Sequence, residues 1–335
     1  MRGATLAAVL ALMTAVLAAG AGERAASAPA VEVVATGVPR PLQLAFDGRA
    51  LVVLSLGSRG DSAGELHRVD LHGELPIDLS HQPRVRVPFV DNKPNTLGSL
   101  AVHPITRELF LGDENGHAVY RVTWEGRMTV YASGLRRLGG GGTLTFDRTG
   151  RLIIVDYVDP RLSRPEERTL PGLEQFRDED DYRGPLVFRL NQDPTIPLPR
   201  RLEVLAPLFP RAWGGRAGGA ALPRLISVAP LPNDDLLFLT STGEVYRLSA
   251  EGKFGRFTRL PPGQYNRTNM VTGEDGSVFV SGGFHVGEIF RIAPDGAVVS
   301  IARNLGDPEG IAVDPAGDVY VAEYARHRIV KIPHL

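Results

Sequence analysis

The chain repeats a short pattern of alternating apolar and polar residues at nearly even spacing. Its clearest copy is Pro308–Ile332, in which apolar runs at 310–313, 319–322 and 328–332 are separated by turns rich in Pro, Asp and Gly. Alternation over about four to eight residues, bounded by such turns, is typical of half-buried β-strands. This copy therefore predicts three short antiparallel strands joined by tight turns.

Five further copies precede this one along the chain. Their innermost predicted strands contain Leu44, Leu100, Leu144, Ile226 and Met270. Most copies continue into a fourth alternating segment, as in Met128–Leu135 and Ala297–Leu305. A period of about 40–45 residues with four short strands per unit is the pattern of β-propeller blades.

The two ends of the chain complement each other. The last copy reaches Leu335 without a fourth strand, whereas Val31–Val38 has the pattern of such a strand but belongs to no other copy. Pairing these segments would remove two exposed sheet edges at once. The sequence therefore predicts an all-β fold, a six-bladed β-propeller whose N-terminal strand completes the last blade.

Composition and the first residues add a compartment to this fold. The 335 residues are 43% hydrophobic, carry a net charge of −1 and include no cysteine. No basic field points to nucleic acid, and disulfides and thiolate metal ligands are excluded. Residues 1–21 combine Arg2, an apolar run and small residues at Ala19 and Ala21, which predicts a signal peptide with cleavage after 21 or as late as 30. We expect a periplasmic or secreted protein without a membrane span once the signal is removed, with one propeller domain over 31–335.

The predicted blades have a short-turn face and a long-loop face. Connections after the first and third strands of each blade are short, whereas the long ones follow the second and fourth strands and include insertions at 157–185 and 206–223. Loops longer than about 12–15 residues in a compact domain are usually functional or disordered. We therefore expect the loop-rich face to be the working surface. Four glycines at 139–142 precede a strand rather than a helix, so they do not predict a phosphate loop.

Residues whose side chains could bind a ligand or take part in catalysis fall on that same face, just before the innermost strands or just after the second strands. They are the carboxylates Asp113, Asp156, Glu309 and Glu323, the amide Asn269, the cation Arg224, the hydroxyls Ser99 and Thr143, and Trp213 of the second insertion. Arg224, Trp213, Ser99 and Thr143 are candidate ligand-binding residues. Asp156 and His285, which has no counterpart in the other copies, are the catalytic candidates, with His285 as a general base. His117 and His327 occupy equivalent repeat positions, which favours a structural role for both.

Several of these side chains are oxygen donors. Glu309, Asn269, Asp156, Asp113 and Glu323 together suit a hard cation such as Ca²⁺ or another divalent ion, which takes six to eight oxygen ligands in the case of calcium. An acid after the second strand can instead accept hydrogen bonds from backbone amides of its own blade. Both interpretations stay open at this point.

Pro308–Ile332 resembles an NHL repeat, and the turns at Asp147/Gly150 and Asp275/Gly276 are similar. The whole mature chain resembles the NHL-repeat and SMP-30/gluconolactonase-like superfamily of six-bladed β-propellers. This resemblance implies a central metal held by Glu, Asn and Asp, and Glu309, Asn269 and Asp156 fall at matching places. The Asn-Gly pair usual in that group is absent, and Gly98-Ser99 and Gly142-Thr143 replace expected ligands.

Three functions follow as hypotheses. The first is an exported NHL-like propeller that binds a protein, peptide, glycan or small molecule on its loop-rich face. The alternative is a metal-dependent hydrolase of lactones or esters, as the resemblance suggests. A weaker alternative is a quinone-dependent sugar dehydrogenase, because Val31–Val53 and Leu100–Pro104 resemble the opening of that family slightly. The catalytic His of that family has no counterpart at Leu138–Thr143.

Overall fold

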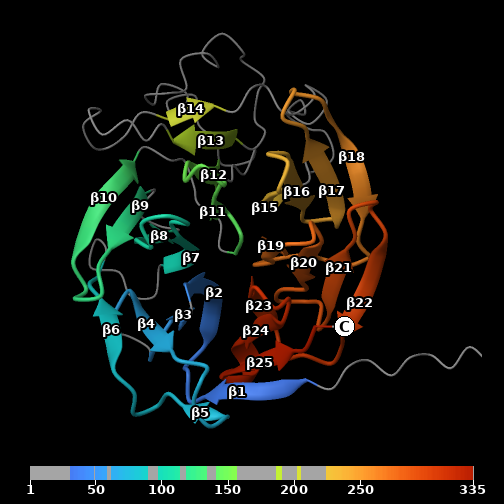
Figure 1. The fold of residues 1–335 in the computed structure, drawn as a ribbon. Coiled ribbons are helices and arrows are strands. Elements are labelled where there is room, and N and C mark those ends of the chain that lie inside the picture. Colours follow the sequence, from blue (N-terminus) through green and yellow to red (C-terminus); the bar gives the residue numbers. More distant parts are fainter. Residues whose placement is uncertain are drawn as a thin grey trace, which may run out of the picture.

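The computed structural model of the protein describes residues 31–48, 50–58, 62–89, 97–113, 118–133, 141–156, 186–190, 202–204 and 224–334. The predicted signal peptide, both predicted insertions, Trp213 and His117 lie outside these residues. In the described part, six β-sheets surround a central axis (Figure 1), which confirms the predicted six-bladed propeller.

Each blade is built on four antiparallel strands, to which blade 6 adds a fifth, and the first strand of each blade lies nearest the axis. Blades 1 to 3 consist of β2 (Pro41–Asp47), β3 (Ala50–Ser55), β4 (Gly64–Val69) and β6 (Arg84–Val87); β7 (Leu97–Val102), β8 (Leu109–Asp113), β9 (Ala118–Val122) and β10 (Met128–Ser133); and β11 (Leu144–Phe146), β12 (Leu152–Asp156), β13 (Leu186–Leu190) and β14 (Leu202–Val204). Blades 4 and 5 consist of β15 (Leu225–Pro230), β16 (Leu236–Thr240), β17 (Glu244–Leu248) and β18 (Phe254–Arg259); and β19 (Met270–Thr272), β20 (Val278–Ser281), β21 (Ile289–Ile292) and β22 (Val298–Ala302).

Blade 6 joins the two ends of the chain, as predicted. It contains β23 (Pro308–Val313), β24 (Val319–Glu323), β25 (Arg328–Ile332) and β1 (Glu32–Thr36), and β1 pairs antiparallel with β25. A short strand, β5 (Ile77–Asp78), adds a fifth member that the sequence pattern does not predict. It comes from the connection between β4 and β6 of blade 1 and pairs in parallel with β1, so blade 1 also covers the closing strand.

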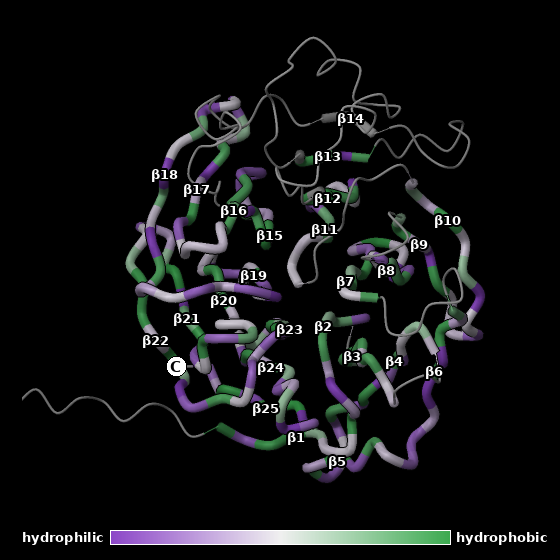
Figure 2. Tube along the Cα trace, turned by 180° about the vertical axis from the view of Figure 1, so that it is seen from behind, coloured by the Kyte–Doolittle hydropathy of each residue, from purple (hydrophilic) through white to green (hydrophobic). Residues whose placement is uncertain are grey.

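The apolar residues fill the spaces between neighbouring blades. At the closure, Val34 and Ala35 of β1 pack with Leu51 and Val53 of blade 1 and with Ala322 of blade 6. The outermost strands, such as β18 and β6, carry many hydrophilic positions (Figure 2) because one side of each faces solvent. None of the helices in the described residues is long and apolar enough to span a membrane.

The short turns on the far face explain the recurring Asp and Gly of the repeat. In blade 3, Asp147 Oδ1 accepts hydrogen bonds from the backbone N–H groups of Thr149 and Arg151 at 3.0 and 2.9 Å. Gly150 then adopts a φ of 83°, which favours glycine. The turns are thus fixed by local chemistry, which leaves the other face free to vary.

Candidate functional site at the mouth of the channel

The strand order gathers the predicted site residues at one end of the channel. In an antiparallel blade, the start of the first strand lies beside the end of the second, as the pairs Leu97 with Asp113 and Pro308 with Glu323 show. Every predicted site residue that the structure describes belongs to such a position or to an adjoining connection on the same face. This end of the channel is called the mouth below.

Asn269 lies close to the propeller axis. Its Nδ2 donates a 2.6 Å hydrogen bond to Oε1 of Gln43. Gln43 belongs to β2 of blade 1 and Asn269 precedes β19 of blade 5, so the bond crosses the channel in front of blade 6. Gln43 is fully buried, and its Nε2 has no hydrogen-bond partner among the described residues.

Gly142 brings blade 3 to the same point on the axis, and the segment before β11 runs inward there (Figure 1). Its N–H donates to the carbonyl of Thr268 at 3.1 Å, and its own carbonyl accepts from Val228 N–H at 2.9 Å. A Cβ atom at this position would overlap Ser227 Oγ and stand 2.5 Å from Asn269 Oδ1. The glycine is therefore required by close packing at the axis, a reason the sequence alone does not supply.

Glu309 and Arg267 form the charged part of the mouth. The Glu309 side chain is fully buried, and its Oε2 stands 3.9 Å from Nη1 of Arg267, whose side chain is 35% exposed. Ser281 Oγ also donates to the backbone carbonyl of Glu309. Burying a carboxylate is costly unless a charge or hydrogen bonds compensate, so Arg267 and Glu309 stabilise each other. Arg267 is exposed enough to meet a ligand as well.

The hydroxyls predicted to bind a ligand contact each other instead of facing solvent. Ser99 Oγ of blade 2 and Thr143 Oγ1 of blade 3 are 2.8 Å apart, and both side chains are fully buried. Asp113, at the end of β8, is fully buried as well. Arg224 is partly exposed, and its backbone N–H donates to Ser241 Oγ at 3.3 Å.

Glu323 is bound within its own blade. Its carboxylate accepts hydrogen bonds from Gly306 N–H at 2.8 Å, from Arg326 Nη1 at 2.7 Å and from Arg328 Nε. The side chain is fully buried. These contacts match the interpretation that an acid after the second strand bonds to its own blade.

His285 lies on the connection between β20 and β21 and is exposed at the mouth face. Its ring packs against Phe284, with centroids 5.3 Å apart and planes at 80°. Phe284 in turn faces Tyr324 of blade 6, with centroids 6.3 Å apart. The predicted general base is thus part of a small group of aromatic rings.

The described donors do not fit a Ca²⁺ ion. Among the residues whose side chains are described, no three His, Asp or Glu side chains converge as a metal group. The guanidinium of Arg267 stands beside the carboxylate of Glu309, where it would repel a cation. Calcium takes six to eight oxygen ligands, and Glu323 of the predicted set is already bound by Gly306, Arg326 and Arg328. Asp156 ends β12, opposite Leu186 in the backbone ladder, and its side chain lies outside the description.

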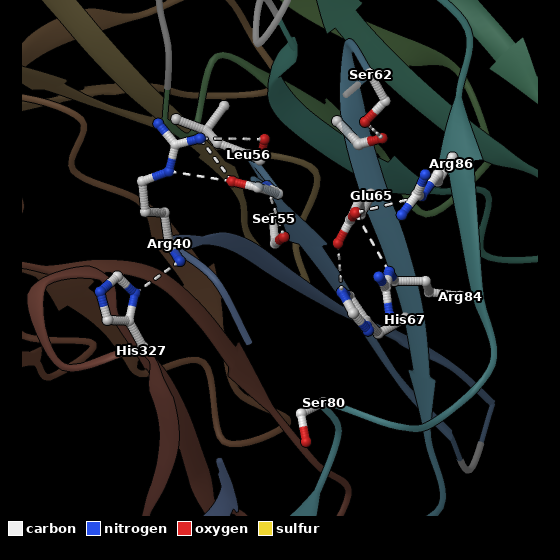
Figure 3. A network of polar contacts seen from close by, with 12 residues as sticks. Arg40, Ser55, Leu56, Ser62, Glu65, His67, Ser80, Arg84, Arg86 and His327 are labelled. Atoms are coloured by element: carbon white, nitrogen blue, oxygen red, sulfur yellow. Dashed lines mark hydrogen bonds and ion pairs between the residues drawn. The ribbon is translucent and has the colours of Figure 1, made fainter. Parts of the chain in front are cut away.

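A second polar cluster lies at the closing seam, the junction of blades 1 and 6 (Figure 3). Arg40 joins the two blades, because its N–H donates to His327 Nδ1 at 2.9 Å while its Nε donates to the Gly57 carbonyl at 3.2 Å. This contact gives His327 the structural role predicted from its repeat position.

Glu65 and His67 of β4 are buried in the same seam, each 1% exposed, with His67 Nε2 3.6 Å from Glu65 Oε2. Arg84 Nε lies 3.2 Å and Arg86 Nε 3.8 Å from Glu65 Oε1. Burial, reinforced by the charge of Arg84, lowers the pKa of His67 to about 4. The sequence reasoning missed this cluster and Arg267, because neither occupies a position that the repeat singles out. The alternation along β4 is the one sequence signal that places His67 on the buried side of its strand.

Comparison with known proteins agrees with this architecture. Residues 305–332 match the NHL repeat family. Among solved structures, a gluconolactonase from Xanthomonas campestris is similar at 15% identity over 90% of this chain and 87% of its own, with a TM-score of 0.58. Regucalcin, a calcium-binding protein from Agrobacterium tumefaciens, is similar at 13% identity over 91% and 93%, also with 0.58. A virginiamycin B lyase from Staphylococcus aureus is similar at 12% identity over 88% and 84%, with 0.52.

At these identities the likeness shows the fold alone. No curated protein sequence matches the chain. The NHL match and the structural neighbours nevertheless confirm the predicted resemblance to NHL-repeat and SMP-30/gluconolactonase-like propellers.

Proposed function

We propose that the protein hydrolyses a lactone or a related ester at the mouth of its channel. The observation that supports this most is the convergence of Asn269, Arg267 and Glu309 beside the axis, in a fold shared with a gluconolactonase. These groups combine hydrogen-bond donors with the partly exposed guanidinium of Arg267 beside the buried carboxylate of Glu309. Such donors can polarise an ester carbonyl.

The reaction would use water as the nucleophile. Water adds to the carbonyl carbon, the ring C–O bond breaks, and the proton lost by water reaches the alkoxide, giving a hydroxy acid. Negative charge develops on the carbonyl oxygen, where the guanidinium of Arg267 and the amide of Asn269 would stabilise it. His285, exposed on the same face, is the candidate to accept the proton from water. Gln43 acts as a positioning residue, because its bond to Asn269 fixes that amide.

A lactone-hydrolysis assay tests the proposal. The purified protein is given a panel of sugar, aliphatic and aryl lactones and esters, and acid release is followed with and without Ca²⁺ and with a chelator. We expect saturable hydrolysis that Arg267→Gln lowers about 100-fold, since removing one transition-state donor costs about 10²–10³ in rate. The thermal unfolding of the variant is recorded beside it.

The matched control is Arg256→Ala, which removes an exposed arginine from the outer strand β18. Its activity should equal that of the unaltered protein. If no lactone or ester is hydrolysed under any of the three metal conditions, the proposed function is wrong.

A further inference from the structure

Three aromatic rings meet on the mouth face at the border of blades 5 and 6. Phe284 is 44% exposed, His285 is exposed, and Tyr324 is half-buried. Phe284 contacts both of the other rings, at the centroid distances given above. We call these three residues the aromatic platform.

Backbone hydrogen bonds attach the platform to the segments that carry the charged pair. Phe284 N–H donates to the carbonyl of Asn266 at 3.0 Å, and Asn266 directly precedes Arg267. Gly283 N–H donates to the carbonyl of Pro308 at 2.8 Å, and Pro308 directly precedes Glu309. Phe284 is therefore held beside the mouth.

Tyr324 is held from the blade 6 side of the same border. Its N–H donates to the carbonyl of Asp307 at 3.1 Å, two residues before Glu309. A Cβ atom on Gly283 would overlap the Asn266 carbonyl, so this close approach of the two segments requires glycine there. The platform is consequently a rigid neighbour of the site rather than the tip of a loose loop.

Phe284 exposes an apolar ring to solvent beside the polar residues of the mouth. Phenylalanine has no hydrogen-bonding atom, so it cannot replace the water that sugar hydroxyls lose when they are buried. A flat apolar ring, by contrast, gains both burial and ring–ring contact.

We propose that the aromatic platform binds a flat apolar ring of the substrate, so that the site prefers aryl-bearing lactones or esters to aliphatic ones. This rests on the proposed function for the reacting group and extends it to the group next to it. The carbonyl would lie toward Arg267 and Asn269, and the aryl ring toward Phe284 and Tyr324.

The test separates binding from hydrolysis by using two lactams that resist hydrolysis. Dihydrocarbostyril carries a fused aryl ring and valerolactam is its aliphatic counterpart, and both affinities are measured by calorimetry on the full mature chain. We expect dihydrocarbostyril to bind about tenfold more tightly. Phe284→Ala should remove that preference, and Phe284→Tyr should keep it.

Ile105→Ala, which truncates an exposed apolar residue on the far face, is the matched control and should leave both affinities unchanged. Equal affinities for the two lactams, or an aryl preference that survives Phe284→Ala, would overturn the platform. If the lactams behave as expected while no lactone is hydrolysed, the platform stands as a binding site and the hydrolase proposal fails. If lactones are hydrolysed without any aryl preference, the hydrolase proposal stands and the proposal for the aromatic platform fails.

Discussion

The mouth and the closing seam both bury polar and charged side chains, but they do so in different surroundings. At the mouth, Gln43 and Asn269 reach each other from blades that are not neighbours, and Arg267 keeps a third of its side chain in solvent. At the seam, Glu65 and His67 lie between two packed blades and are almost fully enclosed.

This difference suits the mouth to binding a ligand and the seam to holding two blades together. At the mouth, Arg267 and Asn269 stay partly exposed and within reach of a ligand, so the cost of burying the polar groups that they contact can be recovered in binding or catalysis. In the seam, by contrast, the stability of the closed ring depends on whether the buried polar groups are paired and whether they are protonated. The two regions should therefore respond differently to the same kind of change.

Removing β1 should have the largest effect, and it acts on the seam. A chain that begins at residue 39 loses the pairing of β1 with β25 and the buried side chains of Val34, Ala35 and Val38. A buried side chain the size of valine contributes about 1.5–3 kcal/mol. With the β1–β25 pairing lost as well, we expect the free energy of unfolding to fall by more than about 5 kcal/mol. Denaturant titration measures it.

The matched control is a chain that begins at residue 31, which keeps β1 and lacks only the preceding residues. It should unfold at the same denaturant concentration as the full chain. If the chain beginning at residue 39 were as stable as this control, β1 would not close the ring.

The closure could be predicted because it depends on strand pattern alone. An unpaired last blade and an unassigned strand at Val31–Val38 define each other, and alternation fixes the face of every strand. The placement of Asn269 and Glu309 at the mouth follows from the same pattern, since it needs only the direction of each strand.

The contacts made by those side chains could not be predicted in the same way. The bond between Gln43 and Asn269 depends on the width of the channel, which no local pattern encodes. The tight packing at Gly142 and the extra strand β5 also depend on how distant segments meet. Glu323 is an intermediate case, because the repeat suggested backbone amide donors and Gly306 N–H is one, whereas the donors Arg326 and Arg328 are side chains that the repeat did not suggest.

The protonation of His67 gives the second prediction, again for the seam. The pKa of His67 is about 4 in the folded protein, against an ordinary value of 6.5. Between these two values His67 is protonated in the unfolded chain and neutral in the folded protein. The free energy of unfolding therefore falls as pH drops from about 6.5 to about 4. The full loss for this group is about 3 kcal/mol.

Protonation of carboxylates in acid also lowers the free energy of unfolding. The informative quantity is therefore the difference in pH dependence between a variant and the unaltered protein. His67→Leu should flatten the part of the pH–stability curve between pH of about 6.5 and about 4, as measured by denaturant titration at each pH. His285→Gln, an exposed histidine at the mouth, should leave that part unchanged. An identical slope in the His67 variant and the unaltered protein would contradict the role of His67.

The smallest effect on stability should come from the mouth, where it will be accompanied by a loss of function. In Gly142→Ala, the new methyl group meets Ser227 Oγ and Asn269 Oδ1, so the two side chains must move apart. Overpacking of this kind costs about 1–3 kcal/mol. Because Asn269 is displaced from Gln43, lactone hydrolysis and lactam binding should fall by more than the lost stability accounts for.

Gly255→Ala is the control for this substitution, because a Cβ atom there meets nothing within 4 Å. It should change neither unfolding nor lactam affinity. If Gly142→Ala lowers stability but leaves lactam affinity intact, Asn269 takes no part in the site. The mouth would then be a packed joint like the seam, and the contrast between the two regions would disappear.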